Sequence, residues 1–307
     1  MFLSQSAYLH LMKPGLFKPA LIIFLLLWRY ISYAQDTTDA VIFHIHSSHT
    51  AFPDTGREKG HVYDKVLYSA ADHYHDSTVL IIAPKKLDAK KTVDLVFWFH
   101  GWRNNVDNAA SFYELTKQFI ASNRNAVLAL AETAKDSPDS YGGKLENPGV
   151  FKALTTDVLN GLRAQHLVTK GCKPGHILLA GHSGAYRVMA RIIKNGQMPI
   201  DEAILFDALY AETPIFLDWI KADQNHRFID LYTDHGGTDE ETHSLVKLIA
   251  REKIPYLESE EGNVNFQAVK DNRILIIHSP HEHNNVINKP DNFELFLENN
   301  PFLNPLE

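Results

Sequence analysis

The chain has 307 residues, 45% of them hydrophobic and 22% charged, which is a globular composition with enough apolar material for a buried core. Its formal net charge is -7 with neutral histidines and it has no block of lysine or arginine, so nucleic acid is not an expected partner. The single cysteine, Cys172, excludes an intramolecular disulfide, and one thiol does not make a metal site. We expect no cofactor.

The first 34 residues have the pattern of a secretory signal peptide. Lys13 and Lys18 precede an apolar run of nine residues, 20–28, and residues 32–34 (Ser-Tyr-Ala) form a small-x-small cleavage site. Nine helical residues rise only about 14 Å, less than the roughly 30 Å hydrocarbon core of a bilayer. We therefore expect cleavage after Ala34, a secreted or periplasmic protein, and one domain over residues 35–307 without a stable membrane span. A retained N-terminal anchor is the alternative.

Short β-rich apolar runs alternate with helical patterns along the rest of the chain. Strands are predicted at residues 40–46, 78–84, 93–100, 126–132, 177–181, 202–207, 227–233 and 273–278. Helices are predicted at 109–121, 150–165, 184–194, 216–220, 242–251 and 292–297.

This alternation predicts the α/β fold class, as a three-layer α/β/α sandwich with a mostly parallel central sheet. Only 24 residues separate Ser183 from Asp207 at the end of the next strand, so no large cap domain is expected. Ligands of such sheets bind at the carboxyl ends of the strands, which makes the residues after each strand the candidates for a site.

Ser183 lies at a predicted strand-to-helix junction, in Gly181-His182-Ser183-Gly184-Ala185. Small flanking residues allow a sharp turn that exposes the serine hydroxyl, and the helix amides behind it can stabilise a developing negative charge. The stretch resembles the G-x-S-x-G nucleophile elbow of the α/β-hydrolases, with alanine at the last position. A glycine-bordered turn whose serine only caps the helix is the alternative.

The resemblance extends to an oxyanion hole and a base. Phe99-His100-Gly101-Trp102 ends a strand where α/β-hydrolases carry their first oxyanion donor, which implies the backbone N–H groups of Trp102 and Gly184 as donors. The base is expected after the last strand, in α/β-hydrolase order. We predict His283 for its loop position; His281 is the alternative, and His278, which ends the strand, is expected to be structural.

Three aspartates compete for the role of the acid. Asp207 follows the strand after the elbow, and an aspartate in the apolar stretch Leu205–Tyr210 is costly without a partner. Asp234 and Asp239 follow the next strand, from which the family usually draws its acid, and Asp239 has the common Gly-x-x-Asp spacing. We predict Asp207, with Asp239 and Asp234 as alternatives.

Over residues 40–300 the sequence is similar to secreted bacterial α/β-hydrolases of undefined substrate. The similarity rests on the strand end 99–102 with Asn104-Asn105, on the loop 139–146, and on Phe206–Tyr210. It implies a serine hydrolase that cleaves a small-molecule or polymer-linked carboxylic ester through a triad and an acyl-enzyme. An amidase or peptidase of the same fold is an alternative. The loop 136–146 follows a strand, so we expect it to influence specificity.

Two further functions remain open. Histidines 44, 46, 49, 61, 73 and 75 cluster in the sequence, and His-x-His on a strand is a plausible metal pair, so a His-ligated metal hydrolase is a distant alternative. No cysteine or clearly spaced third ligand accompanies the pair, and we predict no metal site. A non-catalytic binding module on the same fold is the other alternative.

Overall fold

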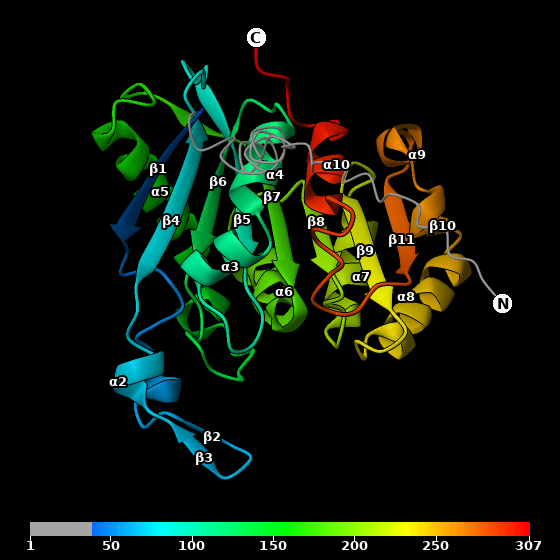
Figure 1. The fold of residues 1–307 in the computed structure, drawn as a ribbon, viewed down its shortest axis with the longest axis horizontal. Helices are drawn as coiled ribbons and strands as arrows, with labels where there is room; N and C mark the ends of the chain where they lie inside the picture. The colour runs from blue at the N-terminus through cyan, green and yellow to red at the C-terminus, as the bar shows by residue number, and fades with distance from the viewer. Residues whose placement is uncertain (1–38) are drawn as a thin grey trace, which may run out of the picture. The chain divides into compact units, whose positions relative to one another are not determined.

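A nine-stranded sheet forms the centre of the protein in this computed structural model, which describes residues 39–307 (Figure 1). The expected signal peptide, residues 1–34, lies outside the described residues. The described residues form one compact unit. In chain order the strands of the sheet are β1 (Ala40–His46), β4 (Thr78–Pro84), β5 (Thr92–Phe99), β6 (Ala126–Ala131), β7 (Lys173–His182), β8 (Glu202–Phe206), β9 (Arg227–Thr233), β10 (Leu257–Glu260) and β11 (Ile274–Ser279).

The sheet has the order β1-β4-β6-β5-β7-β8-β9-β11-β10 and is mostly parallel. β4 pairs antiparallel with both β1 and β6, and the pairs from β6 through β5 to β10 are parallel. The predicted mostly parallel sheet is therefore confirmed. Because the parallel strands share one direction, β7, β8, β9 and β11 end at the same edge of the sheet.

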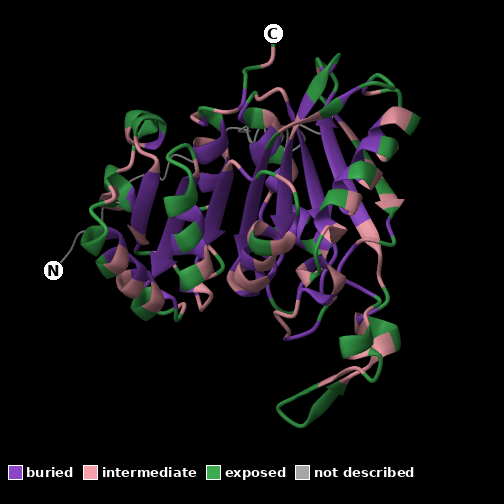
Figure 2. Cartoon of the chain, turned by 180° about the vertical axis from the view of Figure 1, so that it is seen from behind, coloured by how far each residue is buried: buried purple, intermediate pink, exposed green. Residues whose placement is uncertain are grey.

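Helices cover both faces of the sheet, as the alternating pattern predicted. Along β5, Leu95, Phe97 and Phe99 belong to one buried cluster and Val96 and Trp98 to the other. The first cluster is completed by α5 (Val150–Ala164), α6 (Tyr186–Asn195), α7 (Thr213–Ala222) and α8 (Asp239–Arg251). The second is completed by α3 (Val106–Phe112), α4 (Leu115–Ala121), α9 (Phe266–Asp271) and α10 (Asn292–Glu298). The buried strands lie between these two helical layers (Figure 2). The three-layer sandwich is confirmed.

The single helix predicted at 109–121 is wrong, because the chain forms α3 and α4 with a break between them. Glu114 has a left-handed backbone with φ of 52°, which no continuous helix contains. The buried Gln118 side chain donates a hydrogen bond to the Tyr113 carbonyl at 2.8 Å, so the carbonyl freed by the break keeps a partner. No glycine or proline marks this break in the sequence.

The sequence analysis did not predict the smaller elements. Between β1 and β4 the chain forms η1 (Thr55–Arg57), a hairpin of β2 (His61–Tyr63) and β3 (Val66–Tyr68), and α2 (Ala70–His73). The hairpin projects away from the layers (Figure 1) and exposes Val62, Val66 and Leu67. Two short 3₁₀ helices, η2 (Gly143–Glu146) and η4 (Glu261–Asn263), were also missed, as were β10 and α9. Each is short, and short segments carry little periodicity.

Candidate active site

Ser183 directly follows β7 and is the first residue of a 3₁₀ helix, η3 (Ser183–Ala185), that leads into α6. Its φ is 55°, in the left-handed region that serine rarely adopts. A Cβ on Gly181 would lie 2.6 Å from the Ala185 Cβ and 2.8 Å from the Met189 sulfur, so only glycine lets the strand and helix pack this closely. The strain and the close packing together turn the serine side chain out of the sheet edge, at a cost of order 1–3 kcal/mol that the surrounding packing sustains.

The loop after β5 packs directly on this turn. A Cβ on Gly101 would lie 2.6 Å from the Ser183 Cβ, so the glycine allows the loop to approach the serine. The next residue, Trp102, donates no backbone hydrogen bond to the described residues. The Gly184 N–H lies in the first turn of a helix, where no intrahelical acceptor precedes it. The two predicted oxyanion donors, Trp102 and Gly184, thus flank Ser183, and their role stays a prediction.

His283 and Asp207, which are 76 residues apart in the sequence, meet at the carboxyl edge of the sheet. The His283 Nδ1–H donates a hydrogen bond of 2.6 Å to Asp207 Oδ2. The Asp207 carboxylate is fully buried, whereas the His283 side chain is 27% exposed. A histidine ordered by a buried carboxylate and open to solvent on its other side can accept a proton there.

Hydrogen bonds hold Asp207 in its ionised form. Thr233 Oγ1 donates to Asp207 Oδ2 at 2.8 Å, and Thr238 Oγ1 donates to Oδ1. Burial alone would raise the pKa of Asp207, but the hydrogen bonds from His283, Thr238 and Thr233 outweigh burial and keep the pKa below its ordinary value. Asp207 is therefore a carboxylate at neutral pH.

The alternative acids and bases are engaged elsewhere. Asp234 lies 2.9 Å from His278 Nε2, and the other nitrogen of that histidine lies 2.8 Å from Glu260. Asp239 pairs with His243 and His281 with Glu261, at 3.1 and 3.3 Å. The structure therefore brings Asp207 together with His283 and keeps the other candidates apart. The assignment of the acid and base roles stays a prediction.

Ser183 and His283 line one cavity of about 520 Å³ at this edge. Trp102, Tyr113 and Tyr210 form part of its wall. Burial raises the pKa of Tyr210 to about 12, the Asp207 charge adds to the shift, and the neighbouring Ser183 hydroxyl opposes it. Tyr210 is therefore a neutral phenol, and its hydroxyl donates to the Gly236 carbonyl at 2.5 Å.

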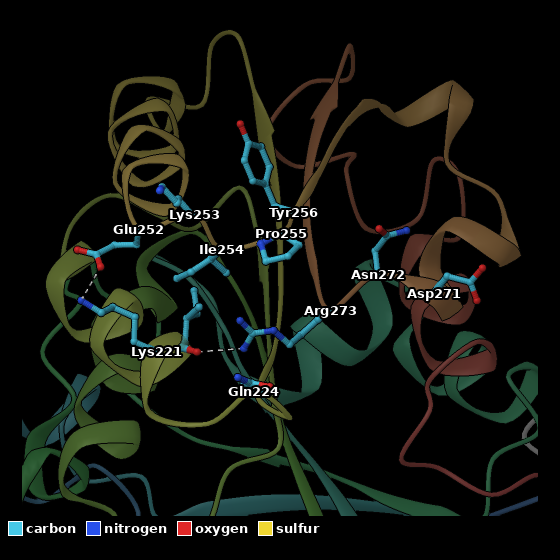
Figure 3. A pocket seen from close by; sticks show the side chains of 11 residues that line it. Lys221, Gln224, Glu252, Lys253, Ile254, Pro255, Tyr256, Asp271, Asn272 and Arg273 are labelled. Carbon is cyan, nitrogen blue, oxygen red and sulfur yellow. Dashed lines mark hydrogen bonds and ion pairs between the residues drawn. The ribbon is translucent and has the colours of Figure 1, made fainter.

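A larger cavity, of about 640 Å³, lies at the opposite edge of the sheet (Figure 3). Its wall includes Tyr256 and Arg273, which precede β10 and β11. The Arg273 Nη1 lies 3.0 Å from each of three backbone carbonyls, which hold this end of the guanidinium against the protein. None of the predicted site residues lines this cavity. The larger of the two cavities is therefore not the candidate active site.

His182, which the sequence analysis gave no role, lies beneath His283. Its Nε2–H donates to the His283 carbonyl at 2.9 Å, and its Nδ1 accepts from the Tyr113 hydroxyl at 3.0 Å. Burial, reinforced by the nearby His283, lowers the pKa of His182 to about 3. His182 is therefore neutral and anchors the loop that carries His283. Its position beside Ser183 was the only sequence signal.

His100 forms a second buried pair, behind the loop that carries Trp102. Its Nε2 lies 2.6 Å from Glu132 Oε1, and both side chains are 1% exposed. Burial lowers the pKa of His100, but the charge and hydrogen bond of Glu132 outweigh burial, so the pKa is raised. The His100 Nδ1–H donates to the Gly101 carbonyl at 2.7 Å. The pair therefore stabilises the loop rather than lining the cavity.

The loop 136–146 contributes no residue to the cavity wall. It contacts the site through Ser140, whose hydroxyl accepts the Trp102 indole N–H at 2.7 Å. The ring of Tyr63, at the tip of the hairpin, packs edge-on against Trp102 at 5.2 Å between centroids. The loop also accepts the Arg103 backbone N–H on the Ser137 carbonyl at 2.9 Å. Any influence of this loop on specificity, which stays a prediction, would act through Trp102 and Arg103.

The histidines of the metal alternative have separate partners. His44 pairs with Asp107 at 2.7 Å and His49 with Asp157 at 2.8 Å. His73 and His75 donate to backbone carbonyls. Within residues 39–307 there is no group of three or more His, Cys, Asp or Glu side chains that could hold a metal ion. In the same residues, every helix is too short or too polar to cross a bilayer.

Comparisons with known proteins identify the fold through solved structures. No family model matches the chain, and no curated protein matches it. The substrate-bound structure of FphF, a fluorophosphonate-binding serine hydrolase of Staphylococcus aureus, matches with a TM-score of 0.51 at 9% identity, over 85% of this chain and 98% of that one. A ferulic acid esterase matches with a TM-score of 0.51 at 10% identity, over 85% and 97%. With its sheet order, its helical layers and these neighbours, the chain has the α/β-hydrolase fold.

Proposed function

We propose that the protein is a serine hydrolase that cleaves carboxylic esters, with Ser183 as nucleophile, His283 as base and Asp207 as acid. The observation that carries the proposal is the 2.6 Å hydrogen bond between His283 and the buried Asp207, on a histidine that lines the same cavity as Ser183. The esterase-type neighbours agree with this chemistry. The substrate is a small-molecule or polymer-linked acyl ester.

In this mechanism His283 accepts the Ser183 proton as the serine oxygen attacks the ester carbonyl. The backbone N–H groups of Trp102 and Gly184 bind the oxyanion. His283 then donates the proton to the leaving alcohol, and water attacks the acyl-enzyme with His283 again as base. Asp207 keeps the imidazole proton on Nδ1 and stabilises the cation that forms in each step.

A fluorophosphonate probe tests the proposal, because it reacts with an activated serine and the neighbour FphF is named for binding such compounds. We expect labelling of Ser183 and hydrolysis of 4-nitrophenyl esters, both abolished by Ser183→Ala. The control is Ser244→Ala, a change in α8, which lies outside the cavity wall.

Three outcomes decide between the alternatives. Folded protein that neither labels nor hydrolyses an ester panel refutes the proposal and favours a non-catalytic binding module. Faster cleavage of matched anilides than of esters makes the protein an amidase. Labelling that persists in Ser183→Ala assigns the nucleophile to another residue.

A further inference from the structure

The wall of the Ser183 cavity has an unusual charge for this chain. The whole sequence has a formal net charge of -7, yet none of the described residues that line the cavity is an aspartate or glutamate. Arg103 is the residue of that wall with a permanent charge. A guanidinium in a wall without acidic side chains of its own attracts an anion, which the rest of an acidic protein repels. The ionised Asp207 behind His283 is fully buried and already accepts hydrogen bonds from that histidine and from two threonines.

Arg103 has no partner for its charge among the described residues. Three other arginines have a carboxylate partner: Arg57 with Asp139 at 2.6 Å, Arg187 with Glu146 at 2.7 Å, and Arg227 with Glu202 at 2.6 Å. The Arg103 guanidinium forms neither an ion pair nor a hydrogen bond with residues 39–307, and the side chain is exposed. Its five N–H donors are therefore available to a ligand.

The backbone of Arg103 is fixed although its side chain is not. The residue has φ of 54°, a left-handed conformation that is strained for arginine, and its N–H donates to the Ser137 carbonyl at 2.9 Å. It directly follows Trp102, whose N–H is the proposed oxyanion donor. The guanidinium is thus attached one residue from the position where the scissile carbonyl would bind.

The rest of this wall combines amides and aromatic rings. Asn104 and Asn108 are joined by a hydrogen bond of 2.7 Å, and Phe112, which is 53% exposed, follows on the same side. Amides accept and donate but do not neutralise a charge. An ester with an apolar body and an anionic end matches this combination.

We propose that Arg103 binds a carboxylate of the substrate, so that the natural ester carries a carboxylate a few bonds from its scissile carbonyl. This inference rests on the proposed serine hydrolase function. A guanidinium binds a carboxylate through two parallel N–H···O bonds, which fixes the orientation of the ester as well as its charge.

Two pairs of esters test the inference, each with one anionic and one neutral member. In 4-nitrophenyl hydrogen glutarate and its methyl ester the charge is on the acyl side, and in 4-acetoxybenzoate and its methyl ester it is on the leaving group. We expect Arg103→Gln to lower the anionic-to-neutral ratio of kcat/KM in one pair by about tenfold or more, with Arg103→Lys intermediate. The matched control Arg251→Gln, at the exposed end of α8, should leave both ratios unchanged.

Equilibrium binding separates this inference from the proposed function. In the Ser183→Ala background, calorimetry should detect binding of the preferred anionic ester, and adding Arg103→Gln should raise its Kd about tenfold. Ratios and Kd values that Arg103→Gln leaves within twofold of the parent overturn the anion subsite. Arg103-dependent binding without any hydrolysis by the wild type overturns the proposed esterase and leaves the anion subsite standing.

Discussion

Asp207 illustrates how one buried side chain acquires a role that its neighbours in the sequence do not have. It is fully buried, and it accepts hydrogen bonds from two threonines and from His283. Asp234 directly follows the next strand, but its side chain is 63% exposed. Burial and pairing therefore distinguish two aspartates that the sequence analysis left in competition.

Asp207→Asn should lower kcat on the order of 10³- to 10⁴-fold, because an amide favours the wrong His283 tautomer and cannot stabilise the imidazolium. The measurement is ester hydrolysis under saturating substrate, with circular dichroism to verify folding. Asp234→Asn, which removes only an exposed partner of His278, is the matched control and should change kcat less than threefold or so. Equal losses in the two variants would contradict the assignment of the acid.

His182 is a positioning residue, because it acts on the site by holding the backbone of His283. Its Nε2–H holds the His283 carbonyl, so His182→Leu should slow fluorophosphonate labelling and lower kcat by about tenfold, with a smaller change in KM. His182→Gln can supply a donor in place of Nε2–H and should recover part of the loss.

The pH profile separates this role from simple destabilisation. Because the pKa of His182 is about 3, the residue is neutral above pH 5 and adds no inflection to kcat/KM there. Both variants should keep the number of inflections of the wild type between pH 5 and 9. An inflection in that range that disappears in His182→Gln would show that His182 itself titrates.

At the scale of single elements, the central strand β9 contains a buried side chain that destabilises the fold when it is ionised. Asp230 is fully buried in β9; its Oδ2 accepts from Thr242 at 2.7 Å, whereas its Oδ1 has no partner. Burial raises the pKa of Asp230 to about 7, and the charge of Asp207 adds to the shift. The strand therefore buries a carboxylate that prefers to be protonated.

Asp230→Asn should stabilise the protein at alkaline pH. The pKa of Asp230 in the folded protein lies above the ordinary 3.8, so the folded state binds the proton of this carboxyl more tightly than the unfolded state does. Its contribution to the free energy of unfolding is therefore complete below pH 3.8 and is lost as the pH rises through 7. The free energy of unfolding should rise by up to about 4 kcal/mol at pH 8, and the gain should fall below about 1 kcal/mol near pH 4.

Urea denaturation at several pH values measures this difference. The control is Asp218→Asn on α7, which removes an exposed carboxylate and should change stability by less than about 0.5 kcal/mol at any pH. A gain for Asp230→Asn that is the same at pH 4 and pH 8 would contradict the buried-carboxylate explanation.

At the scale of the whole molecule, the two edges of the sheet have different uses. The carboxyl edge gathers Ser183, Asp207 and His283 from three separate segments. The cavity at the amino edge is lined by none of these residues, and its Arg273 contacts backbone carbonyls. The β2–β3 hairpin joins the carboxyl edge through the contact of Tyr63 with Trp102. The hairpin contributes no residue to the cavity wall but supports Trp102, which does line it.

The sequence by itself determined eight of the nine strands of the central sheet, the helical layers on its two faces, and the strand-to-helix turn at Ser183. These depend on local periodicity and on small residues beside Ser183, and such signals are complete within about ten residues. The break at Glu114 escaped prediction because a buried glutamine that accommodates it gives no local sign.

Only the tertiary structure decided which residues meet. Asp207, Asp234 and Asp239 all follow strands that end at one edge, so spacing alone could not rank them. The loop from β11 carries His283 to Asp207, and His182 anchors that loop from below. These two hydrogen bonds join residues that are 76 and 101 positions apart in the sequence. Contacts between residues so far apart form only when the whole chain packs, so no local pattern predicts them.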